Sequence, residues 1–191
     1  MANTDNPMGF QLLNGVAVRP PTAYRIEGSE GTAYATALYI GDMVALSSGY
    51  IVKATAGTAN QLLGPIVGFE CINGGLKEGG YYPASSAYNW NALVADDPSQ
   101  RLVAQCDGGG TLAQANIGGT LNIKITHAGS TVTNISGMEI DSSAVSGAVT
   151  DQLRLIGLVD KPGNAWGANG EYIVEIHNHQ LRQENNVDAT T

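Results

Sequence analysis

The chain has 191 residues, 25 of them glycine, with a formal net charge of −8 and only 14% charged residues. A typical domain carries about 25% charged residues, and long solvated helices need Glu, Lys and Arg on their outer faces, so such helices are disfavoured here. The negative charge, with no cluster among the nine basic residues, also argues against binding to nucleic acid or to an anionic membrane surface.

The N-terminus has no basic region followed by an apolar run, so no signal peptide is expected. No stretch approaches the roughly 18 apolar residues that a membrane helix needs. We therefore expect synthesis in a reducing cytoplasm. Cys71 and Cys106 are then expected to be free, buried thiols, although the sequence leaves a disulfide between them open.

The composition divides the chain into three parts. Residues 1–21 mix Asn, Pro and Gly with short apolar pieces and predict an extended N-terminal arm, because Pro20-Pro21 disfavours helix at its end. Residues 22–182 are expected to form a single β-rich domain. Residues 183–191 form a polar C-terminal tail with almost nothing apolar to bury.

Within the domain, short apolar runs alternate with turn residues. Residues 43–46 and 50–54 flank Ser47-Ser48-Gly49, which predicts a hairpin. Segments 56–63 and 142–152 are weak helix candidates, because glycines interrupt them. We expect a mainly β fold, an antiparallel barrel or sandwich of about nine short strands with little helix. The strand candidates are residues 37–40, 43–46, 50–54, 65–72, 92–95, 102–106, 121–125, 131–135, 153–159 and 172–176.

Candidate metal ligands are few. His177 and His179 lie two residues apart on an expected strand, so both would project to one face. A zinc site needs at least a third protein ligand. The remaining histidine is His127, and the cysteines show no paired spacing. Polar residues at a strand end are therefore the preferred interpretation, and no metal or other cofactor is predicted.

Candidate catalytic groups are similarly weak. Asp96-Asp97 precedes Pro98 and predicts a turn rather than a pair of acids on one face. Asp107 and the three glycines after it predict a flexible turn, because the Lys and Ser or Thr of a phosphate-binding loop do not follow. No Gly-x-Ser-x-Gly motif is present. We predict no catalytic residues and no enzymatic activity.

Several short motifs, taken in order, resemble those of the head decoration proteins of tailed bacteriophages. They span the chain from Met1 to about Ile176: the polar opening at 1–10, Gly41-Asp42-Met43-Val44 followed by 49–51, the apolar strand 63–69, Asp96-Asp97-Pro98 before 103–107, Ile117-Gly118, and the stretches 136–141 and 153–158. Met43 stands where the family would have Pro, and the end after Glu175 has no firm counterpart. The resemblance implies a β-rich fold and a role in stabilising a shell, and it supplies no catalytic residue.

The expected function is therefore that of a virion structural protein on the outside of a phage capsid, binding the major capsid protein lattice. A homo-oligomer is expected, and a trimer would match the three-fold positions of a shell. The arm 1–21 is the first candidate contact and the tail 183–191 the second. Host, copy number and the occupied capsid sites stay open.

Three alternatives stay open beside this function. One is another virion component, in the tail or as a minor capsid protein. Another is a carbohydrate-binding module or adhesin, which would need an exposed aromatic platform from Trp90, Trp166 or Tyr81-Tyr82. The last is a hydrolase whose cleft would enclose His127 or His177.

Overall fold

A computed structural model describes residues 3–26, 32–72, 80–86 and 88–182. The fold is mainly β with antiparallel sheets, as predicted; it is consistent with a sandwich, and the described strands form no closed barrel. The two helical elements are single 3-10 turns, η1 (Leu13–Gly15) and η2 (Gln114–Asn116). The strands are β1 (Gln11–Leu12), β2 (Thr22–Ile26), β3 (Leu38–Tyr39), β4 (Met43–Ser47), β5 (Tyr50–Lys53), β6 (Gly64–Cys71), β7 (Tyr81–Tyr82), β8 (Trp90–Val94), β9 (Arg101–Gln105), β10 (Thr120–Leu121), β11 (Ile123–Lys124), β12 (Glu139–Ile140), β13 (Leu153–Leu158) and β14 (Glu171–Ile176).

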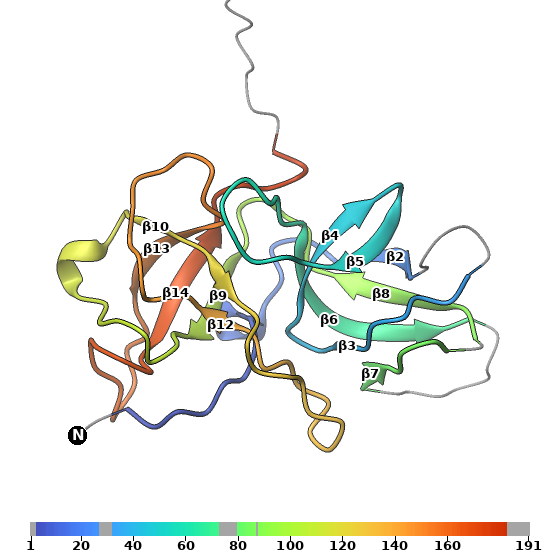
Figure 1. Ribbon diagram of the computed structural model, residues 1–191, viewed down its shortest axis with the longest axis horizontal. Helices are drawn as coiled ribbons and strands as arrows, with labels where there is room; N and C mark the ends of the chain where they lie inside the picture. The colour runs from blue at the N-terminus through green and yellow to red at the C-terminus, as the bar shows by residue number, and fades with distance from the viewer. Residues whose placement is uncertain (1–2, 27–31, 73–79, 87, 183–191) are drawn as a thin grey trace, which may run out of the picture.

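Two five-stranded sheets occupy opposite halves of the molecule (Figure 1). The first sheet has the order β1-β9-β14-β13-β10 and the second has the order β2-β8-β6-β4-β5. Two short ladders, β3 with β7 and β11 with β12, complete the described pairings. The chain passes between the halves several times, for example from β8 in the second sheet to β9 in the first.

Alternation of apolar residues orients the strands of the first sheet. The predicted strand at 172–176 is β14, in which Tyr172, Val174 and Ile176 are buried and the residues between them are partly exposed, the pattern of a strand with one covered face. These side chains pack in a cluster to which β9, β13 and the N-terminal Phe10 also contribute. The first sheet therefore covers one side of a largely aliphatic core.

The second sheet contains the predicted hairpin. Strands β4 and β5 pair antiparallel, and Ser48 and Gly49 both have positive φ, 51° and 85°, as a two-residue turn of the I′ kind requires. Its core is richer in aromatic side chains and includes Tyr82 and Trp90. The two apolar clusters are separate, so each half of the molecule has its own core.

Asp42, within the Gly-Asp motif, joins the parts of the chain that meet between the two halves. It is fully buried, and its carboxylate accepts hydrogen bonds from Tyr39 N at 2.9 Å and Ser136 Oγ at 2.6 Å. Lys53 Nζ lies 3.3 Å from the same carboxylate and balances its charge. A buried charge is tolerated when it is paired and hydrogen-bonded, as the carboxylate of Asp42 is here. The Gly-Asp motif therefore has a structural role.

The N-terminal arm is extended but belongs to the fold. Phe10 is buried in the first core, and β1 pairs with β9. The buried amide of Gln105 accepts a hydrogen bond from Asn6 N and donates one to Thr4 O. Residues 3–12 are therefore fixed to the protein's own surface.

Residues 131–135, expected as a strand, form a turn instead. Ser130 Oγ accepts hydrogen bonds from Val132 N and Thr133 N, both at 3.2 Å, and Asn134 has φ of 61°. Local bonds from a serine hydroxyl compete with strand pairing. Val132 consequently lies on the surface. The loop between β11 and β12 that contains this turn reaches the lower edge of Figure 1.

The weak helix candidates, residues 56–63 and 142–152, are loops without a helix. Both cysteines are free, as expected; Cys106 is buried, but Cys71 is only partly buried, contrary to the expectation. Among the described residues, no helix has the length and apolar character required to cross a bilayer. The tail 183–191 lies outside the described residues.

Candidate functional site

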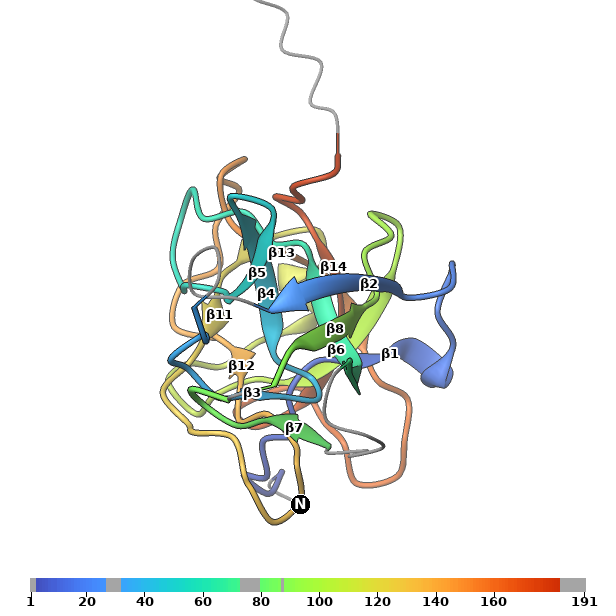
Figure 2. The same ribbon diagram turned by 90° about the vertical axis from the view of Figure 1, so that its right-hand side faces the viewer.

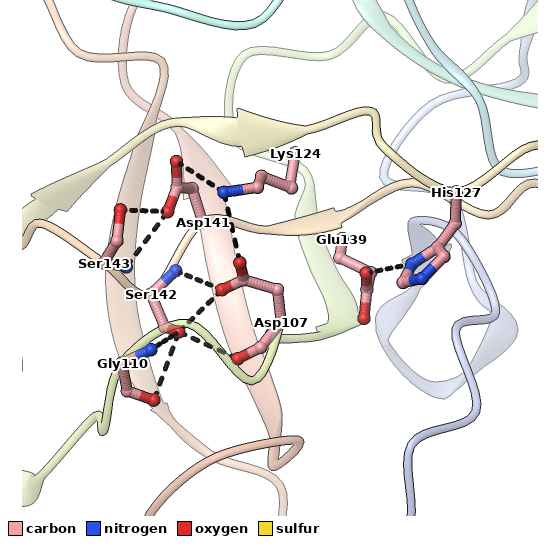
Figure 3. Close-up of polar contacts among 8 residues, drawn as sticks. All are labelled: Asp107, Gly110, Lys124, His127, Glu139, Asp141, Ser142 and Ser143. Carbon is pink, nitrogen blue, oxygen red and sulfur yellow. Dashed lines mark hydrogen bonds and ion pairs between the residues drawn. The ribbon is translucent and has the colours of Figure 1, made fainter.

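A polar cluster lies beside the first sheet, where β11 and β12 meet the turn after β9 (Figure 3). Lys124 Nζ lies 3.3 Å from Asp107 Oδ2 and 3.5 Å from Asp141 Oδ2. The other carboxylate oxygen of Asp107 accepts hydrogen bonds from Ser142 N at 2.8 Å and Ser142 Oγ at 2.7 Å. Ser142 Oγ also accepts a hydrogen bond from Gly110 N at 3.0 Å, which closes the turn.

The ionisation of this cluster favours a structural role. Burial alone would raise the pKa of Asp107, but the hydrogen bonds from Ser142 and Lys124 outweigh it and lower the pKa. The ion pair with Asp107 raises the pKa of Lys124. Both groups are held in their charged forms, so the amine is no nucleophile and the carboxylate no general acid near neutral pH. The predicted turn after Cys106 is confirmed, but its anchoring by Asp107 was not foreseen.

Glu139 and His127 form a second pair next to the cluster. Glu139 is buried, its Oε2 lies 2.6 Å from His127 Nδ1, and its Oε1 has no hydrogen-bond partner among the described residues. Burial raises the pKa of Glu139, while the bond from His127 opposes the rise. In Figure 3 the Glu139 carboxylate points toward His127 and away from the amine of Lys124, its cross-strand neighbour.

The other two histidines do not share a face. Strand β14 ends at Ile176, so His177 and His179 follow the strand rather than lie on it. His177 Nδ1 lies 2.9 Å from Arg154 Nη2, whereas His179 is buried and its Nδ1 accepts a hydrogen bond from Leu181 N. No group of three or more potential metal-ligating side chains occurs in the described part of the chain.

The Asp96-Asp97 pair is a turn, as predicted. Gln100 N donates to Asp97 O at 2.9 Å, and Ser99 N donates to Asp97 Oδ1 at 2.7 Å. Asp97 also pairs with Arg19 at 2.8 Å, and Asp96 accepts a hydrogen bond from Tyr24 at 2.6 Å. Burial and this bond raise the pKa of Tyr24 to about 12.

The aromatic side chains named as a possible sugar-binding platform contact other rings. Trp90 and Tyr82 are buried and contact each other edge to face. Tyr81 stacks on Tyr39, and Trp166 packs against Tyr172; both Tyr81 and Trp166 are partly buried. These contacts stabilise the fold.

An exposed apolar segment is the most distinctive surface feature. Val16 is 66% exposed and Val18 is 58% exposed. The amide of Gln100, itself only 3% exposed, accepts a hydrogen bond from Val18 N at 2.8 Å and donates to Val16 O at 3.3 Å. The ion pair between Arg19 and Asp97 holds the end of the segment. The protein thus fixes two apolar side chains in solvent.

A groove of about 340 Å³ lies next to this segment. It runs between β1 with η1 and the middle of β6, which lie close together in Figure 2. None of its lining residues is charged, although the chain carries a net charge of −8; they are Met8, Phe10, Gln11, Leu12, Gly15, Ile40, Ile66, Val67 and Ile135. We call the segment 16–18 and this groove together the uncharged surface.

No pattern in the sequence points to the residues that build this surface. Gln100 is one of several isolated glutamines, and its partners Val16 and Val18 lie more than 80 positions away. The apolar character of Val16 and Val18 was visible, but their exposure was not. Compared with protein-family models, with curated proteins and with solved structures, the chain gives no match.

Proposed function

We propose that this protein is a non-enzymatic structural subunit of a bacterial virus particle that decorates the outer capsid surface by binding the major capsid protein lattice. On this proposal it is made in the host cytoplasm, assembles as a homo-oligomer and resides on the capsid exterior; a trimer would match the three-fold positions of a shell. A ligand that binds only the assembled shell stabilises that shell by mass action at every occupied site.

The observation that carries the proposal is the uncharged surface. Apolar side chains exposed next to an apolar groove mark protein interaction sites in soluble proteins. Because Gln100 already fixes the segment 16–18, little conformational entropy is lost when a partner covers Val16 and Val18. The absence of charge in the groove removes the desolvation cost that the acidic remainder of the surface would impose.

The part of the arm expected to contact a partner is 13–21. Both parts of the arm are bound to the protein itself, but residues 13–21 contain η1 and the two valines whose side chains stay exposed. Deleting residues 1–21 is consequently a poor test, because it also removes Phe10 from the first core.

The test is co-sedimentation of the purified protein with expanded, undecorated phage shells. The wild type should pellet with the shells at a fixed ratio to the major capsid protein. A protein that stays in the supernatant at all concentrations at which the shells are intact would overturn the decoration role.

Two matched variants locate the contact. Changing Val16 and Val18 together to Asp should abolish co-sedimentation without loss of stability, because both side chains are already in solvent. Val149→Asp is the control, since Val149 is 74% exposed on a loop outside the uncharged surface, and it should pellet like the wild type. If the double variant also pellets normally, the decoration role stands and the uncharged surface is not the contact.

A further inference from the structure

Residues 177–182, called the strap below, join the two halves of the molecule. The strap follows β14 of the first sheet and pairs with Leu62, which precedes β6 of the second. Leu62 N donates to Asn178 O at 3.0 Å, and Gln180 N donates to Leu62 O at 2.9 Å. The side-chain amide of Gln180 accepts a hydrogen bond from Leu46 N at 2.7 Å and donates one to Leu46 O at 3.1 Å. It thus bonds the backbone of β4 as a neighbouring strand would.

A buried imidazole lies at the centre of the strap. His179 is 2% exposed, and its Nδ1 accepts a hydrogen bond from Leu181 N at 3.0 Å. An Nδ1 that accepts carries no proton, so the proton of the neutral ring is on Nε2. Nε2 is buried and has no hydrogen-bond partner among the described residues.

Adding a proton would break this arrangement. The new N–H at Nδ1 would face the N–H of Leu181, so a hydrogen bond would be replaced by two opposed donors. The charged groups that face the ring are Arg182 of the strap and Asp96 and Asp97 of the loop after β8. Burial and the charge of Arg182 outweigh the two carboxylates and the backbone of Leu63, and lower the pKa of His179 to about 4.

We propose that the strap is an acid-sensitive latch: a proton that binds Nδ1 of His179 detaches residues 177–182 from Leu46 and Leu62. Detachment frees the backbone groups of Leu46 and Leu62 and removes one connection between the two halves. The latch depends on the buried ring and its Leu181 bond and is independent of any capsid partner.

The size of the effect follows from linkage. In the detached strap His179 is solvated and titrates near its ordinary pKa of 6.5, against about 4 in the attached strap. The detached state therefore binds more protons between these values, and the attached state loses stability as the pH falls through this window. From pH 7 to pH 4.5 the equilibrium constant for detachment should rise about 50-fold.

Hydrogen exchange of the full-length protein, followed by mass spectrometry and corrected for the intrinsic pH dependence of exchange, measures detachment. Peptides that contain the amides of Leu62, Gln180 and Leu181 should lose about 50-fold in protection from pH 7 to pH 4.5. Peptides from β9 and β14 should keep their protection. Protection of the strap that does not change with pH would overturn the proposal.

Two variants separate His179 from other acid effects. In His179→Asn the side-chain oxygen can accept the Leu181 bond and does not titrate, so most of the pH dependence should be lost. His177→Asn changes a neighbouring, partly buried histidine of the strap, whose pKa burial and the charges of Arg154 and Arg182 also lower, and it should leave most of the pH dependence intact. An unchanged pH dependence in His179→Asn, or its loss in His177→Asn alone, would contradict the role of His179.

A measurement on the wild type alone tests the proposal even if a variant fails to fold. In a titration followed by nuclear magnetic resonance, the Leu46 amide and the His179 ring should shift with the same midpoint. Separate midpoints would show that detachment is not coupled to this proton.

Discussion

The two halves of this protein reach the same antiparallel architecture with different interiors. The second core contains Trp90 in edge-to-face contact with both Tyr82 and Phe69, at centroid distances of 6.1 and 6.4 Å. The first core is mainly aliphatic, and buried polar side chains surround it, among them Gln105 and Gln152. The half that contains the second sheet is stabilised by contacts between large apolar side chains, and the half that contains the first sheet also depends on hydrogen bonds from buried side-chain amides.

The lengths of the strands explain this difference. The edge strands of the first sheet, β1 and β10, are two residues long, so long loops supply much of its surroundings. Loop backbone groups that become buried need partners outside a ladder. Gln152 alone bonds four backbone groups around the first core: it accepts from Gly57 N and Ile123 N and donates to Thr55 O and Asn60 O. Buried amides therefore take over the role that strand pairing has in the second half.

The largest effect is expected from truncation in the aromatic core. Trp90→Ala removes a buried ring that contacts Tyr82 and Phe69, and it should lower the free energy of unfolding by about 3–5 kcal/mol. Urea unfolding followed by circular dichroism measures this. Val132→Ala, at an exposed site, should change it by less than about 0.5 kcal/mol. Equal losses for the two variants would mean that Trp90 is not a core residue.

A pair of glycines, one in each sheet, compares the packing directly. A Cβ on Gly64 in β6 would lie 2.1 Å from Ala95 O, so Gly64→Ala must displace backbone and should cost about 3 kcal/mol. A Cβ on Gly157 in β13 would meet nothing within 4 Å, so Gly157→Ala should be neutral or slightly stabilising. Thermal unfolding of both variants gives the comparison, and a tolerated Gly64→Ala would rule out the close approach.

Removal of one buried amide tests the first half. Gln152→Ala leaves four backbone groups, of which that of Ile123 is buried, without this partner and should cost about 2–3 kcal/mol. Gln114→Ala, on the exposed turn η2, is the matched control and should cost almost nothing. If both variants unfold at the same urea concentration, the amide network does not stabilise the first half.

The smallest expected effect is the pH dependence of the stability that Asp151 contributes. Burial would raise the pKa of Asp151, but hydrogen bonds from Ser146, Thr120, Thr58 and Asn122 lower it. Because the folded-state pKa is lowered, Asp151 stabilises the fold at neutral pH and loses this contribution as the pH falls through that lowered value. The gap in unfolding free energy between the wild type and Asp151→Asn should be about 1 kcal/mol at pH 7 and shrink toward pH 2. A gap independent of pH would exclude this linkage.

Local patterns were sufficient for much of the fold. The hairpin of β4 and β5, the strand at 172–176 and the turn at Asp97 were all predicted, because each depends on neighbours in sequence. The prediction of a strand at 131–135 was wrong. The apolar residues Val132 and Ile135 are typical of a strand, but the Ser130 hydroxyl accepts hydrogen bonds from the amides of Val132 and Thr133 and stabilises a turn instead.

The features that define the candidate sites depend on distant partners. Gln105 binds Thr4 and Asn6 about a hundred positions earlier, and Asn3 donates to Ala165 O across 162 positions. The arm was predicted to be extended, but these bonds that fix its first part to the domain could not be seen in the sequence. The histidines were placed on a common strand face, because nothing near them shows that β14 stops at Ile176.

The sequence by itself determined that this chain folds as short antiparallel strands, since period, turn residues and low charge act over a few residues. Only the tertiary structure decided which polar side chains satisfy buried backbone, which valines stay in water, and where His179 is enclosed. Those outcomes depend on the desolvation of groups brought together from remote segments, and desolvation has no local signature in the sequence.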